Sequence, residues 1–241
     1  MTSHQTSPTT ADTLRELLAA AQCVLFDFDG PITAVFGGHE AQVVAAALDS
    51  RIASWPRAPE LTDRTDPMQI LLDVAVAFDG SEHDHRVAEL DKLLADQEAI
   101  AVASARPTPY ADSLVRRLVA RGTSVAVTTN NSAAAVLSYL ELRGLAVCFG
   151  PHVHGRAADP LLMKPHPSCV REAIRSTGVS AGQCLMIGDS PRDYQASSAA
   201  GVAFLGYAKN DRKQRQLAEA GVEYMVDSLA DVYEAADAGQ H

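Results

Sequence analysis

Short apolar runs alternate with stretches of helical periodicity along most of the chain, most regularly from about residue 110 onward. Apolar runs bounded by turn residues predict strands at 23–26, 124–129, 146–150, 183–189, 202–206 and 223–228. Helical spacing of apolar residues predicts helices at 11–21, 110–122, 132–144, 167–178, 191–201 and 211–221. Strands that alternate with helices are typical of a parallel sheet covered on both faces. The pattern therefore predicts an α/β fold with a doubly wound parallel sheet.

The stretch 36–105 breaks this alternation, because it contains no convincing strand. Helical periodicity occupies three segments instead, at 39–55, 67–78 and 85–103. Asp66 followed by Pro67 is a good N-cap with a first-turn proline. We therefore expect a disordered Ser/Thr/Pro-rich tail, a core in two pieces and an inserted all-helical module, at 1–10, 11–35 with 106–241, and 36–105 respectively.

The composition narrows the classes of partner. The 241-residue chain has a formal net charge of −10, which argues against nucleic-acid binding. That charge does not argue against a small phosphorylated substrate, because a bound metal ion can invert the local field. No apolar run approaches the roughly 18 residues that span a bilayer, and the polar N-terminal segment has no signal-peptide core. We expect a cytoplasmic protein without nucleic-acid or membrane partners, and the oligomeric state stays open.

Four groups of polar residues lie where predicted strands end or predicted helices begin. They are Asp27-Phe28-Asp29-Gly30, Thr129-Asn130, Lys164, and Gly188-Asp189-Ser190 with Asp193. Each group alone is more often a surface turn than a site. Together they would converge at one edge of a parallel sheet, where four aspartates would repel one another without a cation. A metal ion and the lysine supply the missing positive charge.

The four groups resemble, in chain order, the four motifs of the haloacid dehalogenase (HAD) superfamily in its phosphatase branch. The matching stretches are DFDGPIT (27–33), VAVTTN (125–130), Lys164 and GDSPRD (188–193). The inserted segment lies between the first two motifs, as does the small helical cap of phosphoglycolate-phosphatase-like members. The resemblance implies a Rossmann-like core with a helical cap, Mg²⁺ as cofactor and a small phosphorylated metabolite as substrate.

The resemblance also implies roles for the acidic residues. Asp27 resembles the nucleophile that forms an aspartyl-phosphate, and Asp29 resembles the general acid and base. Asp27, the backbone carbonyl of Asp29, and Asp189 resemble Mg²⁺ ligands. Asp193 is expected to support the metal from its second shell or through water.

Other positions are expected to meet the substrate. Thr129, with the amide of Asn130, would bind phosphoryl oxygens, and Lys164 would neutralise charge on the nucleophile and the transferring group. Thr128 is the alternative to Thr129. Gly30 allows the turn that follows the first motif and is counted among the substrate-binding residues. His39 is expected to meet the leaving group.

Two departures from the main hypothesis stay open. A sugar phosphomutase of the same superfamily has the same core residues and differs in its cap contacts. A non-catalytic member could use the fold as a binding module. The dehalogenase branch is disfavoured because it lacks an acid at the position of Asp29. The phosphonate-cleaving branch needs a cap lysine that forms a Schiff base. It is disfavoured because Lys92, the only lysine in 36–105, lies on a charged helix face. His152 and His154 are expected to lie in a surface loop.

Overall fold

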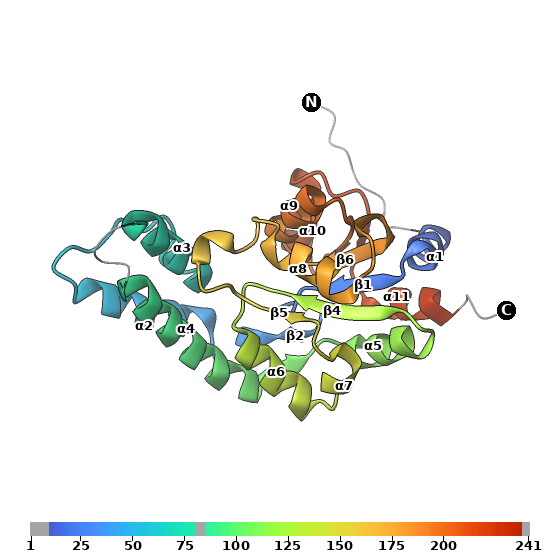
Figure 1. Cartoon of the computed structure of the whole chain (residues 1–241), viewed down its shortest axis with the longest axis horizontal. Helices are drawn as coiled ribbons and strands as arrows, with labels where there is room; N and C mark the ends of the chain where they lie inside the picture. The colour runs from blue at the N-terminus through green and yellow to red at the C-terminus, as the bar shows by residue number, and fades with distance from the viewer. Residues whose placement is uncertain (1–9, 81–84, 238–241) are drawn as a thin grey trace.

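The computed structural model describes residues 10–80 and 85–237. Over these residues, six parallel strands form one sheet in the order β5-β4-β1-β6-β7-β8. Figure 1 labels β5, β4, β1 and β6 of this sheet. The strands are β1 (Cys23–Phe26), β4 (Ser124–Thr128), β5 (Val153–His154), β6 (Cys184–Gly188), β7 (Ala203–Tyr207) and β8 (Met225–Val226). The parallel order, with helices between the strands, confirms the predicted α/β fold class.

The central strand β1 lies between β4 and β6. Phe26, the last residue of β1, is in register with Val127 of β4 and Ile187 of β6. The carboxyl ends of the three strands therefore lie side by side, and the residues that follow them share one edge of the sheet. Open parallel sheets bind ligands at this edge.

Both faces of the sheet are covered, which explains why β1 is a continuous apolar run. Val24 and Phe26 belong to one hydrophobic cluster, whereas Cys23 and Leu25 belong to the other. Burial of one large apolar side chain contributes about 1.5–3 kcal/mol, so β1 joins both layers firmly. The first cluster packs against α1 (Ala11–Ala20), α5 (Ala111–Ala120), α6 (Ala133–Leu142) and α11 (Leu229–Asp237). The second packs against α8 (Ser168–Thr177), α9 (Pro191–Ala200) and α10 (Asp211–Glu219) (Figure 1).

Three further helices form a cap at the end of the molecule away from α1 and α11 (Figure 1). They are α2 (Ala41–Ala53), α3 (Pro67–Phe78) and α4 (His85–Ser104). The side chain of Asp66 accepts hydrogen bonds from the backbone N–H groups of Met68 and Gln69, which confirms the predicted N-cap. The cap has its own apolar cluster, and Met163, from the core, packs into that cluster.

A two-stranded antiparallel ladder joins the cap to the core. It pairs β2 (Thr33–Ala34) with β3 (Arg106–Pro107). Short 3-10 turns lie at η1 (Val35–Gly37), η2 (Pro160–Leu162) and η3 (Ala181–Gln183). The residue bounds of core and cap stay a prediction. The predicted tail 1–10 lies outside the described residues, except that Thr10 caps α1.

The structure corrects the sequence predictions in three places. Residues 146–150, predicted as a strand, form the short helix α7 (Ala146–Phe149), since a short apolar run does not distinguish a strand from a helical turn. Val147 is 88% exposed, which a strand buried on both faces would not allow. His154 lies in β5 instead of a surface loop. The pattern also does not predict α11, which buries Leu229 and Val232 against the sheet.

None of the helices described has both the length and the apolar character that crossing a bilayer requires.

Candidate active site

A cavity of about 620 Å³ lies at the carboxyl edge of the sheet, between core and cap. The residues that follow β1, β4 and β6 line its floor, and the starts of α9 and α10 line one side. The cap contributes a wall with the polar residues Asp63, Thr65 and Asp66 and the apolar Met68. The predicted site residues that line the cavity are Asp27, Asp29, Thr129, Asn130, Lys164, Asp189 and Asp193.

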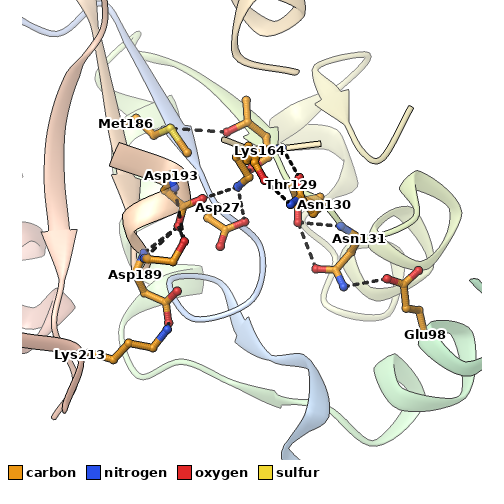
Figure 2. A network of polar contacts seen from close by, with 12 residues as sticks. Asp27, Glu98, Thr129, Asn130, Asn131, Lys164, Met186, Asp189, Asp193 and Lys213 are labelled. Atoms are coloured by element: carbon orange, nitrogen blue, oxygen red, sulfur yellow. Dashed lines mark hydrogen bonds and ion pairs between the residues drawn. The ribbon is translucent and has the colours of Figure 1, made fainter. Parts of the chain in front are cut away.

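Three buried carboxylates converge on the floor of this cavity. Asp27, Asp189 and Asp193 each offer an oxygen within 4.8 Å of the others, and each side chain is buried (Figure 2). Burial, followed by the charge of Asp193, raises the pKa of Asp27 to about 7. Burial likewise raises the pKa of Asp189 to about 6. Crowded buried carboxylates are costly unless a cation joins them, and an all-oxygen donor set of this kind fits a hard divalent cation such as Mg²⁺.

Asp29 stands apart from the three carboxylates. Its Oδ1 accepts a hydrogen bond of 2.9 Å from the backbone N–H of Val35, which turns the side chain toward the start of the cap. Burial raises the pKa of Asp29 to about 6, although the bond from Val35 opposes the shift. A carboxyl group with such a pKa exchanges a proton near neutral pH.

The ammonium group of Lys164 neutralises part of the acidic cluster. Its Nζ donates to Asp27 Oδ1 at 2.8 Å and to the carbonyl oxygen of Thr128 at 2.8 Å, and it lies 2.5 Å from Asp193 Oδ1. Burial alone would lower the pKa of Lys164, but Asp193 and Asp27 outweigh burial and raise it. The lysine is therefore a fixed positive charge with three oxygens within 2.8 Å of its Nζ.

The segment after β4 presents Thr129 and not Thr128 to the cavity. The hydroxyl of Thr128 lies 4.0 Å from the sulfur of Met186, whereas Thr129 lines the cavity. The side chain of Asn130 bonds the backbone of Lys164 twice, through Nδ2 to its carbonyl at 3.0 Å and through Oδ1 to its N–H at 2.7 Å. The second and third motif segments are thus held against each other.

Asp193 is held in place by the first turn of α9. Ser190 and Asp193 form a capping box around Pro191, the pattern that starts a helix at GDSPRD. Asp193 Oδ2 accepts from the N–H of Asp189 at 3.2 Å and from the N–H of Ser190 at 3.0 Å. Because its other oxygen faces Lys164, most of the hydrogen-bonding capacity of Asp193 is already used within the protein.

Gly30 lies directly beside Asp189. Its φ is +115°, and a Cβ built on it would lie 2.6 Å from Cγ and Oδ2 of Asp189. Gly30→Ala is therefore expected to displace Asp189 and weaken Mg²⁺ binding at least about tenfold, which titration calorimetry would measure. Gly122→Ala is the matched control, because Gly122 also has a positive φ (+84°) but nothing within 4 Å. Equal Mg²⁺ affinity in the two variants would contradict the expectation.

His39 does not line the cavity. Its Nε2 lies 2.9 Å from Oε1 of Gln97 on α4, so its predicted contact with the leaving group stays a prediction. His152 and His154 both bond the hydroxyl of Ser176, at 3.0 and 2.7 Å. These bonds explain the histidine pair without a metal ion.

Sequence reasoning misses several groups at the site. Lys213, on α10, pairs with Asp189 at 3.0 Å. Its position shortly after β7, another strand that ends at this edge, could have predicted that it lies at the site. Arg192, inside the fourth motif, reaches the cap, where its Nη2 donates to Gln69 Oε1 at 2.7 Å and its Nη1 donates to Asp66 Oδ2 at 3.2 Å. Asn131 and the buried Glu98 also lie here (Figure 2).

Comparison with known proteins gives a consistent result. The family model for haloacid dehalogenase-like hydrolases matches residues 21–201. A phosphoglycolate phosphatase of Rhodospirillum rubrum is 32% identical over 195 residues, which cover 75% of this chain and 77% of that protein. A phosphoglycolate phosphatase of Pectobacterium atrosepticum is 28% identical, covering 89% of this chain and 92% of that protein.

Solved structures show the same fold. A predicted phosphatase from Clostridium acetobutylicum superposes with a TM-score of 0.69 at 19% identity, covering 88% of this chain and 96% of that one. CbbY from Rhodobacter sphaeroides, in complex with phosphate, superposes with a TM-score of 0.64 at 18% identity, covering 91% and 96%.

Proposed function

Since the chain belongs to the haloacid dehalogenase-like hydrolases and is a phosphatase of that family, we propose that it hydrolyses phosphate monoesters of small metabolites through an aspartyl-phosphate on Asp27, with Mg²⁺ as cofactor. The observation that carries the proposal is the setting of Asp27. It lies on the floor of the cavity, paired with Lys164 and close to Asp189 and Asp193. A buried carboxylate held beside positive charge is suited to nucleophilic attack on phosphorus.

The three buried carboxylates support the metal assignment. Asp27, Asp189 and the backbone carbonyl of Asp29 would hold Mg²⁺, with Asp193 contributing through water or by holding its neighbours. When bound, the ion would neutralise charge on the phosphoryl oxygens.

The protein's own groups divide the chemistry among them. Asp27 Oδ attacks phosphorus as the ester oxygen leaves, and Asp29, whose pKa burial raises to about 6, gives that oxygen a proton from its protonated form. Asp29 then takes a proton from the water that attacks the acyl-phosphate, which returns Asp27 and releases phosphate. Throughout, Lys164 keeps its positive charge beside Asp27. The backbone N–H of Asn130, at the cavity, donates to a phosphoryl oxygen, because the single hydroxyl proton of Thr129 is already donated to Asn131 Oδ1.

Phosphoglycolate is the first substrate to assay, because the curated relatives described above carry that name. We expect Mg²⁺-dependent release of phosphate from phosphoglycolate or from an aryl phosphate, loss of turnover in EDTA, and recovery with excess Mg²⁺. Turnover that EDTA leaves unchanged would contradict the metal assignment. Bisphosphate-dependent isomerisation without net phosphate release would identify a phosphomutase instead. The cytoplasmic location expected from the sequence belongs to the same proposal.

A further inference from the structure

Glu98 is a fully buried carboxylate outside the acidic cluster. It lies on α4, the last cap helix, and its exposed fraction is 0%. It faces residues 129–132, which we call the phosphate loop because they follow β4 at the cavity (Figure 2). A buried carboxylate costs several kcal/mol of desolvation unless the protein supplies charge and hydrogen bonds, so its contacts define its role.

Four donors surround the carboxylate of Glu98. Oε1 accepts from Asn131 Nδ2 at 3.0 Å and from Arg156 Nη1 at 2.9 Å. Oε2 accepts from the N–H of Ser132 at 3.0 Å and from Arg156 Nη2 at 3.2 Å. Two of the four donors, Asn131 Nδ2 and the N–H of Ser132, belong to the phosphate loop. These two bonds fix the orientation of the loop relative to the ion pair of Glu98 and Arg156.

The contact continues from Asn131 to Thr129, the first residue of the phosphate loop. Thr129 Oγ1 donates to Asn131 Oδ1 at 3.0 Å and accepts from the N–H of Asn131 at 3.1 Å. The amide of Asn131 is therefore fixed by Glu98 at Nδ2, and it in turn fixes the hydroxyl of Thr129 at Oδ1. Figure 2 shows the three side chains in this sequence.

Arg156 holds the same loop from the other side. Its side chain is 2% exposed, and its Nη1 also donates to the carbonyl of Asn130 at 2.8 Å. The Nε of Arg156 donates to Asp91 Oδ1 at 2.5 Å. Asp91 itself does not touch the phosphate loop. A Cβ at the preceding residue, Gly155, would lie 2.7 Å from the carbonyl oxygen of Asn131, so this strand of chain lies directly on the loop.

We propose that Glu98 is a positioning residue that, through Asn131 and the N–H of Ser132, sets the orientation of the phosphate loop and so couples helix α4 of the cap to phosphate binding. The proposal rests on the proposed function in taking residues 129–132 to bind the phosphoryl group. An apolar pair would attach α4 to the core equally well, but it would leave the amide of Asn131 and the hydroxyl of Thr129 free to turn.

Glu98→Gln tests the proposal, with Asp91→Asn as the matched control because both carboxylates bond Arg156. The probe is inorganic phosphate, titrated calorimetrically in the presence of Mg²⁺. We expect Glu98→Gln to weaken phosphate binding about tenfold and Asp91→Asn to change it less than about twofold. In turnover, Glu98→Gln should lower kcat/KM by the same factor for phosphoglycolate and an aryl phosphate, since the loop meets the group that both share.

A double-variant cycle locates the effect. Because Asn131 is one of the two groups through which Glu98 reaches the loop, Glu98→Gln should weaken phosphate binding by a smaller factor in an Asn131→Ala background than in the wild type. If Glu98→Gln does not fold, because Arg156 loses one of its two carboxylate partners, the double variant Glu98→Gln/Arg156→Gln removes both charges and is expected to show the same tenfold loss. Unchanged phosphate affinity in the folded variant, an equal loss in Asp91→Asn, or multiplying losses in the cycle would overturn the proposal. Phosphate binding is measured without turnover, so a wild-type protein that hydrolyses nothing would refute the proposed function alone.

Discussion

Asp27→Asn is expected to remove about 10⁴-fold or more of the phosphatase turnover and to stabilise the metal-free protein. Turnover is lost because an amide cannot form the acyl-phosphate. Stability rises because burial and the charge of Asp193 raise the pKa of Asp27 to about 7 from an ordinary value of 3.8. A carboxyl whose pKa is raised on folding costs stability as pH rises from about 4 to 7, and the gain from removing it is on the order of a few kcal/mol.

Denaturant unfolding in EDTA would measure this gain at pH 5 and at pH 8. The advantage of the variant over wild type should be larger at pH 8, where the native carboxyl is ionised. Asp12→Asn serves as the control, because Asp12 lies on the surface with its side chain 86% exposed. A variant that turns over phosphate esters, or that is less stable than wild type at pH 8, would count against the assignment of Asp27.

Lys164→Met is expected to lower both activity and stability. The substitution leaves Asp27 and Asp193 without their shared cation, and breaking a buried ion pair in this way costs about 3–5 kcal/mol. Loss of a positive charge beside the transferring group should also reduce kcat by about 10²–10³-fold. Thermal unfolding and steady-state kinetics in Mg²⁺ would measure the two effects.

Lys92→Met provides the comparison for Lys164. Lys92 pairs with Asp96 at 2.7 Å, but its side chain is 75% exposed, so its loss should change stability by less than about 1 kcal/mol. Equal stability of the two methionine variants would show that the buried ammonium does not hold the acidic cluster together.

The core of the site could be predicted because strand order places it. Asp27, Thr129 and Asp189 each follow a buried apolar strand, and three adjacent parallel strands bring the residues after them to one edge. Local chemistry also carries information at the fourth motif, where Ser190, Pro191 and Asp193 are the residues that start a helix. Short-range patterns therefore located both the fold and the acidic cluster.

The parts that escaped prediction depend on long-range contacts. Glu98 lies on a helix that periodicity predicts, but its burial depends on the approach of Asn131, 33 residues later, and of Arg156. Arg156 follows in a loop without periodicity, and its oxygen acceptors lie in two distant segments, Asp91 and Glu98 on α4 and Asn130 after β4. No local pattern distinguishes such a glutamate from a solvated one, because its burial depends on tertiary contacts and not on spacing.

One peptide bond links the apolar interior of the cap to the ammonium that neutralises Asp27. Met163 inserts its side chain among the cap helices, and Lys164, the next residue, points into the acidic cluster. If the insertion were deleted and replaced by a short linker, Met163 would lose its apolar packing partners, and the backbone that carries Lys164 would lose a contact that holds it in place. A cap transplanted from another hydrolase would need an apolar site that accepts this methionine. The inserted cap therefore helps to position the active-site lysine.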